Sequence, residues 1–351
     1  MIAAYLQKNN SPQERSPMCT AISFHSDHHY FGRNLDLEYH YQEEVTITPR
    51  AFPLPFRLAD TLTSHYAMIG MAYVTDNYPL YYDATNEMGL SVAALNFPGN
   101  CVYHEPRPGK NNITPFEFIP WILGLCSCLT EAKVLLSGLN LVNLPFCDTL
   151  PLSPLHWMIS DSKSSVVVES TSDGLKIYDN PIHVLTNNPT FDHQLFFLNN
   201  YSHLSAFQPS SSPFGIPLSL YSRGMGGIGL PGDYSSPSRF VRAAFVRDCT
   251  NDYNKKMAEK DDSAPADQNF LSQFFHILLS VSTPKGLVAV ENGSFQYTIY
   301  SSCCDTDLGI YYYITYDNLQ IHAIDMHHAS LDSCNLYRYP LILQPQISWQ
   351  L

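Results

Sequence analysis

The sequence MCTAISFHSDHHYFGRNLD, residues 18–36, decides the expected fold. It predicts two strands on either side of a turn at residues 26–28, because β-branched and aromatic residues are enriched on both sides of that turn. Residues 1–18 are polar and match no regular pattern, so we treat them as an N-terminal extension. The ordered part of the protein is therefore expected to begin at Cys19.

Beyond these two strands, the sequence alternates blocks of strands and helices. The blocks are expected at residues 19–97 (strands), 114–138 (helices), 155–187 (strands), 236–281 (helices) and 295–326 (strands). No regular β–α–β alternation occurs, which favours an α+β class with helices on the outer faces of mostly antiparallel sheets.

Two segments interrupt this order. Residues 192–236 mix aromatic residues with Ser, Pro and Gly, and they sustain neither a helical nor a strand period. Loops and short helices are expected there. Residues 251–266 are strongly charged and are expected to separate the two later helices. We find no internal repeat, so residues 19–351 are predicted to form a single domain.

Composition restricts the class of protein. The chain has 351 residues, of which 45% are hydrophobic and 15% charged, and its formal net charge is -13. A chain so rich in core residues is globular, and its acidic balance argues against a nucleic-acid partner. No apolar run reaches the length of about 18 residues that a membrane span needs, and no secretory signal is evident. The nine cysteines include no Cys-x-x-Cys pair and indicate reduced thiols in a cytoplasmic protein.

Cys19 is the strongest chemical signal. If the residues up to Met18 are absent from the mature protein, Cys19 carries a thiol and a free α-amine together. An α-amine has a pKa of about 7.7–8.0 and can act as a base, unlike a peptide nitrogen. Arg33 would favour the thiolate, and Asp36 would orient the amine. Cysteines elsewhere, such as Cys126, are more often small buried hydrophobes.

Eight motifs in order resemble the choloylglycine hydrolases, a family that includes bile salt hydrolases and penicillin V acylases. They are MCTAISF, YFGRNLD, ITPR, TNEMGLSVAALNFPG, LHWMISD, VLTNNPTFD, GLPGDYSSPSRFVR and YTIYSSC. The resemblance runs from Met18 to about Tyr316. It implies an N-terminal-nucleophile hydrolase with an αββα four-layer sandwich of two mostly antiparallel sheets, in which removal of the leader exposes the cysteine.

The resemblance also implies roles for six residues. Amide N–H donors at an oxyanion site stabilise the tetrahedral intermediate by roughly 2.7–4 kcal/mol each. The implied roles are nucleophile for Cys19, its support for Arg33 and Asp36, the oxyanion site for Asn96 and Asn187, and a position near the thiolate for Arg239.

Asn188 and Arg242 are neighbours that could take the roles implied for Asn187 and Arg239. From the residues alone, an Asn before Phe-Pro or Asn-Pro is ordinary turn chemistry. Asn188 adjoins Asn187, and the Thr-Asn order of the family points to the first of the two. Arg242 lies one helical turn from Arg239 and is expected to be a solvated or paired surface charge.

The implied reaction is amide hydrolysis through a thioester, with no metal and no organic cofactor. Asn96 favours glycine- or taurine-conjugated bile salts as substrates, because penicillin acylases often have Tyr at this position. Penicillin V and N-acyl homoserine lactones remain alternative substrates. The resemblance further implies a homotetramer, with residues 192–222 as a candidate interface.

The segment before Met18 leaves three possibilities open. It is absent because translation starts at Met18, or it is removed autocatalytically, or it is retained. In the last case Cys19 is blocked and the chain is a ligand-binding or assembly protein. His25, His28 and His29 lie around a turn and are expected to be solvated rather than metal ligands.

Overall fold

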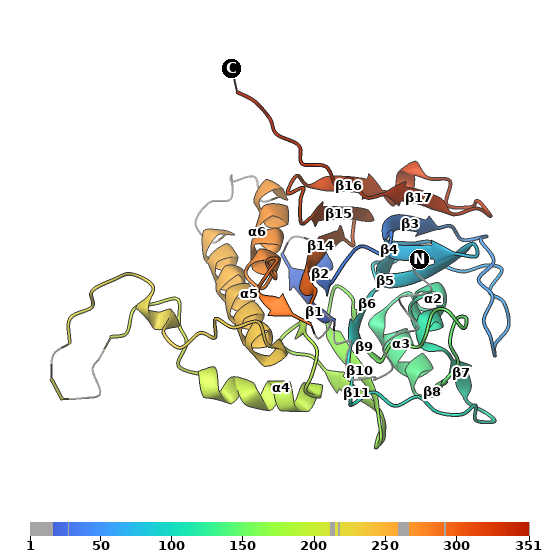
Figure 1. Cartoon of the computed structure of the whole chain (residues 1–351), viewed down its shortest axis with the longest axis horizontal. Helices are drawn as coiled ribbons and strands as arrows, with labels where there is room; N and C mark the ends of the chain where they lie inside the picture. Colours follow the sequence, from blue (N-terminus) through green and yellow to red (C-terminus); the bar gives the residue numbers. More distant parts are fainter. Residues whose placement is uncertain are drawn as a thin grey trace.

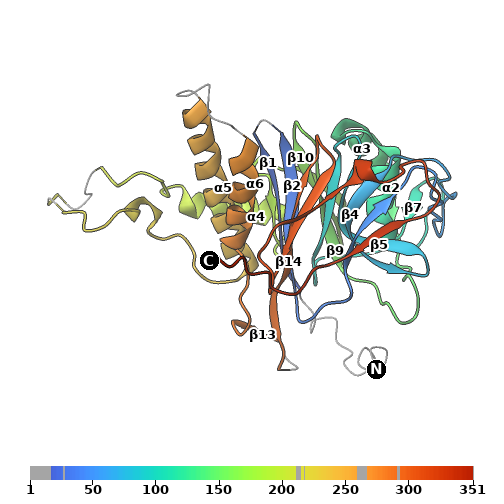
Figure 2. The same ribbon diagram turned by 90° about the horizontal axis from the view of Figure 1, so that it is seen from above.

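The computed structural model describes residues 17–26, 28–210, 215–216, 218–258, 267–290 and 293–350. Two β-sheets pack face to face, and helices cover the outer face of each, as Figures 1 and 2 show. This arrangement confirms the α+β class and the four-layer αββα sandwich. Most of residues 1–18 and part of the charged segment 251–266 lie outside the described residues.

The first sheet carries the start of the ordered chain. All of its strand pairs are antiparallel, and β13 pairs with β14 beside the main order. The main order is β12 (Val184–Leu185), β1 (Met18–His25), β2 (His29–Leu37), β14 (Phe295–Asp305), β15 (Ile310–Thr315) and β16 (His322–Asp325), and β13 spans Val288–Ala289.

The second sheet has eight strands and is also antiparallel throughout. Its middle strands are rich in β-branched and apolar residues, because both of their faces are covered. The order is β11 (Gly174–Asp179), β10 (Ser165–Thr171), β9 (Leu155–Ser160), β6 (Ser91–Asn96), β5 (Tyr78–Asn86), β4 (Met68–Thr75), β3 (Glu44–Thr48) and β17 (Tyr337–Pro340).

Two groups of helices form the outer layers (Figure 2). Helices α5 (Ser236–Ala258) and α6 (Asp267–Leu279) pack on the first sheet, and α2 (Phe118–Leu125) packs on β5 and β6 of the second, followed by α3 (Leu129–Leu136). The Glu117 carboxylate accepts the backbone N–H of Thr114 over 2.9 Å at the start of the short helix η1, where the sequence Thr114-Pro115 predicts a helix start.

The remaining elements are short. Helix α4 and the turns η2 and η3 lie in the irregular region that the sequence predicts at residues 192–236. Within that region residues 211–214 and 217 are outside the described residues. The elements are α4 (Phe191–Phe197), η2 (Leu198–Tyr201), η3 (Met225–Gly227), η4 (Met326–His328) and η1 (Pro115–Glu117), with β7 (Asn111–Ile113) and β8 (Leu139–Leu141) as a parallel pair.

Two hydrophobic cores hold the layers together. One fills the space between the sheets and extends under α5 and α6, and it includes Phe31, Tyr300 and Phe240. The other lies between the second sheet and α2, with Trp157 stacked on Phe118 at a ring distance of 4.3 Å. The first core surrounds β1, so the start of that strand is shielded from water.

Four elements depart from the sequence prediction. Strand β17 and the pair β7–β8 are not evident from the sequence, because each is three or four residues long and depends on a partner distant in the chain. Helix α5 continues to Ala258, well into the charged segment that was expected to separate the helices. Among the described residues, no helix is both long and apolar enough to cross a lipid bilayer.

Candidate active site

Cys19 lies at the start of strand β1, where strand β2 places two charged residues beside it. In the antiparallel register, Met18 pairs with Asp36 and Ala21 pairs with Arg33. The Cys19 side chain is buried, and Nη2 of Arg33 donates a hydrogen bond to its Sγ over 2.7 Å. A guanidinium so close to sulfur stabilises negative charge on that atom.

Arg33 also joins the two sheets. Its Nη1 donates to the carbonyl oxygen of Tyr82 in β5 over 3.0 Å and to that of Ala94 in β6. Burial opposes the charged form, but negative charge at Cys19 and Asp83 outweighs it and raises the pKa of Arg33. The guanidinium is therefore a fixed positive charge, held from both sheets next to the sulfur.

Asn187 links the nucleophile to two other segments. It follows β12, and its Oδ1 accepts hydrogen bonds from the Cys19 nitrogen and from Nη2 of Arg239, each over 2.8 Å. Its Nδ2 donates to the carbonyl oxygen of Asn96 at the end of β6 over 2.8 Å. Arg239, in the first turn of α5, also donates to the Cys19 carbonyl oxygen and to Oγ1 of Thr20. One amide side chain thus brings together β1, β6 and α5.

Asp36 has spare hydrogen-bonding capacity. Its Oδ1 accepts from Oγ1 of Thr298 over 2.6 Å, whereas its buried Oδ2 has no partner among the described residues. Burial raises the pKa of Asp36 to about 6, against the opposing effects of Arg239, the Thr298 hydrogen bond and Arg33. A carboxylate with a free oxygen near Cys19 is suited to accept a further donor, such as an α-amine.

The cluster resolves the two ambiguities in the sequence. Asn187 contacts Cys19, whereas Asn188 points its Nδ2 at the carbonyl oxygen of Pro98 over 2.7 Å. Arg242 lies one turn beyond Arg239 along α5, and its Nη1 donates to the carbonyl oxygen of Pro231, in the turn before the helix, over 2.8 Å. The structure therefore brings together all six residues that the sequence indicates and leaves these two neighbours outside.

Some contributors were not evident from the sequence. Tyr82 and Ala94 act through backbone carbonyl groups, which any residue type could supply. Thr298 binds Asp36 from β14, but threonine is an ordinary strand residue and gives no local signal. Only the pairing of strands distant in the chain identifies these contacts.

The expectation of solvated histidines is wrong for His29. This side chain is buried, and its two ring nitrogens lie 2.9 Å from the hydroxyl groups of Ser23 and Thr306. Nδ1 of His28 lies 2.7 Å from Oδ2 of Asp305, the last residue of β14. That carboxylate is about 280 residues away in the chain, so the local spacing could not reveal it. Asp27 of the same turn lies outside the described residues.

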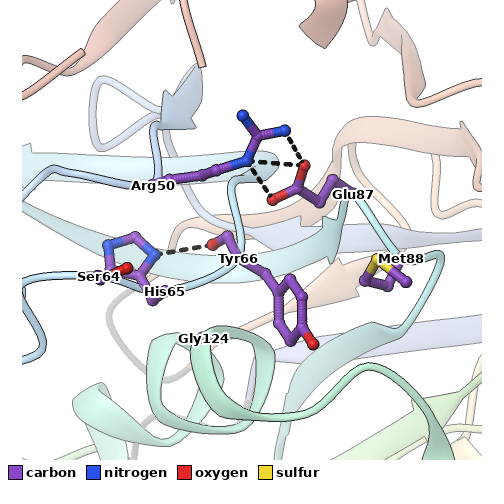
Figure 3. Close-up of a pocket in the computed structure, with 7 residues that line it drawn as sticks. All are labelled: Arg50, Ser64, His65, Tyr66, Glu87, Met88 and Gly124. Atoms are coloured by element: carbon purple, nitrogen blue, oxygen red, sulfur yellow. Dashed lines mark hydrogen bonds and ion pairs between the residues drawn. The ribbon is translucent and has the colours of Figure 1, made fainter. Parts of the chain in front are cut away.

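Two surface hollows lie apart from the Cys19 cluster. Figure 3 shows one of them, next to the ion pair of Arg50 with Glu87. The second lies between the irregular region and α5, and Cys249 and Tyr253 line it. None of the six predicted site residues lines either hollow. The first is lined by Arg50, Ser64, His65, Tyr66, Glu87, Met88 and Gly124.

Comparison with known proteins agrees with this geometry. The family model "Linear amide C-N hydrolases, choloylglycine hydrolase family" matches residues 19–339. A bile salt hydrolase/transferase of Lactiplantibacillus plantarum is 53% identical over 330 residues, which cover 94% of this chain and 98% of the relative. A bile salt hydrolase/transferase of Clostridium perfringens is 39% identical and covers 92% and 96%, respectively.

Solved structures show the same fold. A crystal structure of a variant of the conjugated bile acid hydrolase from Clostridium perfringens superposes with a TM-score of 0.85 at 38% identity, covering 94% of this chain and 99% of that chain. A penicillin V acylase from Agrobacterium tumefaciens, at 18% identity, shares the fold with a TM-score of 0.68 and covers 92% and 90%. The chain therefore belongs to the choloylglycine hydrolase family of linear amide C–N hydrolases.

Proposed function

We propose that this protein hydrolyses the amide bond of glycine- or taurine-conjugated bile salts, with Cys19 as the nucleophile. The observation that carries the proposal is the 2.7 Å hydrogen bond from Arg33 Nη2 to Cys19 Sγ inside a buried cluster. The names and high identity of the bacterial relatives support the substrate class.

The first step requires a free amine on Cys19. In the structure its nitrogen is a peptide amide that donates to Asn187 Oδ1. Removal of the residues before Cys19 converts this nitrogen into an α-amine, which can act as a base near neutral pH. The unpaired Oδ2 of Asp36 then offers an acceptor that orients the amine.

Acylation follows from this geometry. The α-amine takes the thiol proton of Cys19, and the sulfur attacks the amide carbonyl of the conjugate. The carbon–nitrogen bond breaks as the protonated α-amine delivers that proton to the leaving glycine or taurine. Negative charge develops on the carbonyl oxygen, where amide donors of Asn187 and Asn96 would stabilise it. Arg33 stabilises the attacking sulfur as a thiolate.

Deacylation reverses these roles. The α-amine removes a proton from water, the resulting hydroxide attacks the thioester, and the bile acid leaves as the sulfur recovers its negative charge. Arg239 holds the Cys19 carbonyl and Asn187 through both steps, so the nucleophile and the donor keep their separation.

One experiment tests the proposal. We expect purified protein of a mass that begins at Cys19 to release glycine and taurine from glycocholate and taurocholate, and the Cys19→Ser variant to be slower by about 10³-fold or more. Faster release of phenoxyacetate from penicillin V, or cleavage of N-acyl homoserine lactones alone, would replace the bile salt assignment. An unprocessed, inactive chain would favour a binding or assembly protein.

Assembly and location stand as further parts of the proposal. The irregular region exposes Phe196, Phe207, Tyr221 and Ile228, each more than half accessible. A set of exposed apolar side chains is typical of a protein interface. We therefore propose a homotetramer that buries this region. All nine cysteines are free, as is typical of a reducing compartment, and on that ground we propose a cytoplasmic location. Light scattering of the purified protein tests the assembly, and a monomer would contradict it.

A further inference from the structure

His156 in strand β9 lies between the two segments that carry Asn96 and Asn187. Its ring stacks on that of Phe97 with centroids 4.3 Å apart and planes 6° apart. Its Nε2 lies 2.9 Å from the carbonyl oxygen of Thr186. Phe97 follows Asn96 directly, and Thr186 precedes Asn187, so one imidazole contacts both neighbours of the asparagine pair.

Glu169 in strand β10 fixes this imidazole. Its Oε1 lies 3.2 Å from Nδ1 of His156 and also accepts the backbone N–H of Phe191 over 3.0 Å. Both side chains are completely buried. Glu169 therefore binds both the imidazole of His156 and the backbone at the start of α4, the helix that follows the Asn187 segment.

The hydrogen bonds fix the orientation of the ring. A carbonyl oxygen only accepts hydrogen bonds, so Nε2 must carry a proton to bind Thr186. The hydrogen bond between Nδ1 of His156 and Oε1 of Glu169 needs a second proton, which lies between these two atoms. Oε2 of Glu169 is buried and has no hydrogen-bond partner among the described residues. Burying a carboxyl oxygen without a hydrogen-bond partner raises the free energy of the folded state. Such an oxygen therefore needs a specific explanation.

We propose that His156 and Glu169 form a positioning pair that sets the separation of Asn96 and Asn187. The inference builds on the proposed function, because it assigns these asparagines to the oxyanion site. The His156 side chain contacts Phe97, Thr186 and Glu169, which are not themselves reacting groups. Its effect is therefore transmitted through the backbone on either side of the site.

Other contacts in the same segments support this view. The side-chain Nε2 of Gln194 donates to the carbonyl oxygens of Asn187 and Pro189 over 2.5 and 2.9 Å. Asn188 reaches Pro98 on the other segment. These contacts fix the ends of the segments, and His156 adds a side chain that contacts Phe97 and Thr186, the residues next to the two asparagines. Misplacing a catalytic donor by about 1 Å costs on the order of 10² in rate.

The test compares variants of His156 with a matched histidine elsewhere. His156→Phe keeps a flat ring for stacking on Phe97 but removes the bond to Thr186. His65 is likewise buried, and its ring nitrogens lie 2.7 and 2.8 Å from the carbonyl oxygens of Tyr66 and Phe52, but it lies beside the hollow in Figure 3. His65→Phe therefore controls for the loss of a buried imidazole.

We expect His156→Phe to lower kcat for glycocholate by about 10-fold to 10²-fold with KM changed less than about threefold. The rate at which iodoacetamide alkylates Cys19, followed by peptide mass, should stay within about twofold because the nucleophile is untouched. His65→Phe should leave kcat unchanged. Equal losses of kcat and alkylation, or an unchanged kcat, would overturn the proposal.

Glu169→Gln provides an independent variant if His156→Phe fails to fold. It keeps the side-chain shape and removes the charge, and we expect a smaller loss of kcat of about threefold to tenfold, with alkylation again unchanged. An unchanged kcat in Glu169→Gln would contradict the pair. If the wild-type protein itself releases no glycine or taurine, the proposed function fails. If the wild type and the variants are equally active, the proposed function stands and only the positioning pair fails.

Discussion

The two ends of strands β1 and β2 bury polar side chains in opposite ways. At the Cys19 end, two guanidinium groups and the Asp36 carboxyl group are buried together, and Oδ2 of Asp36 has no hydrogen-bond partner within the described part of the chain. At the other end, burial and the neighbouring His25 and His183 lower the pKa of His29 to about 3, so its ring is neutral between two hydroxyl groups.

This difference separates a reactive cluster from a structural one. Buried charges are costly to fold and persist only where compensating charges lie close by, as Arg239 and Asp36 do. Neutral groups with satisfied hydrogen bonds stabilise the fold and offer little chemistry. Variants at the Cys19 end should therefore affect turnover, and variants at the histidine end should affect stability.

The largest expected effect is at Asn187. Asn187→Ala removes the proposed oxyanion donor and should lower kcat for glycocholate by about 10²–10³-fold. Asn188→Ala is the matched comparison: it removes the bond to Pro98 but keeps the Asn187 amide beside Cys19, so we expect kcat to fall by less than about tenfold. Initial rates of glycine release measure both variants. Equal losses in the two would mean that the segment acts as a whole and that the donor role is wrong.

A smaller effect is expected at Arg33. Arg33→Gln removes the positive charge at the sulfur, and we expect the alkylation rate of Cys19 near neutral pH to fall by about tenfold or more, because the thiolate loses its cation. Arg242→Gln serves as the control, since the Arg242 guanidinium donates to the carbonyl oxygen of Pro231 in the turn before α5. Circular dichroism establishes that each variant is folded. An unchanged alkylation rate would remove Arg33 from the chemistry.

A variant at His29 should change how the free energy of unfolding depends on pH and should leave turnover nearly unchanged. Folded His29 takes a proton only below a pH of about 3, whereas an unfolded histidine takes one below about 6.5, so the unfolded state binds more protons between these values. The free energy of unfolding therefore falls as the pH drops through that window. We expect His29→Gln to flatten this dependence in urea titrations and to change kcat less than about twofold.

The outcome that would contradict this prediction is a pH dependence of unfolding as steep in His29→Gln as in the wild type. A large loss of kcat in the same variant would show that the two ends are coupled, which the contrast between them does not predict. Near neutral pH we expect the substitution to cost about 1–3 kcal/mol, because it disrupts buried hydrogen bonds to Ser23 and Thr306.

The smallest effect is expected at Ser160. Its hydroxyl lies 2.8 Å from that of Ser23 and 3.3 Å from Nε2 of His29, and it is buried. Ser160→Ala removes one hydroxyl group and should lower the free energy of unfolding by about 1 kcal/mol without a change in kcat. Thermal unfolding followed by calorimetry measures the difference. A change in turnover would contradict the separation of the two ends.

Much of the fold could be predicted from local patterns. The strands around Cys19, the helix start at Thr114 and the start of α5 near Ser236 each follow from residue types within a few positions. The missed strand β17 contains Pro340 and pairs only with β3, so its strand character comes from a partner almost 300 residues away. Short elements of this kind have no periodicity to detect.

The sequence by itself determined the fold class, the family resemblance and the six residues of the Cys19 cluster, because these depend on residue identity and on motif order. Only the tertiary structure decided that Asn187 Oδ1 accepts the Cys19 nitrogen, that His29 is buried, and that His156 contacts both asparagine segments. Those facts depend on strand pairing and packing between residues far apart in the chain, and no local pattern encodes them.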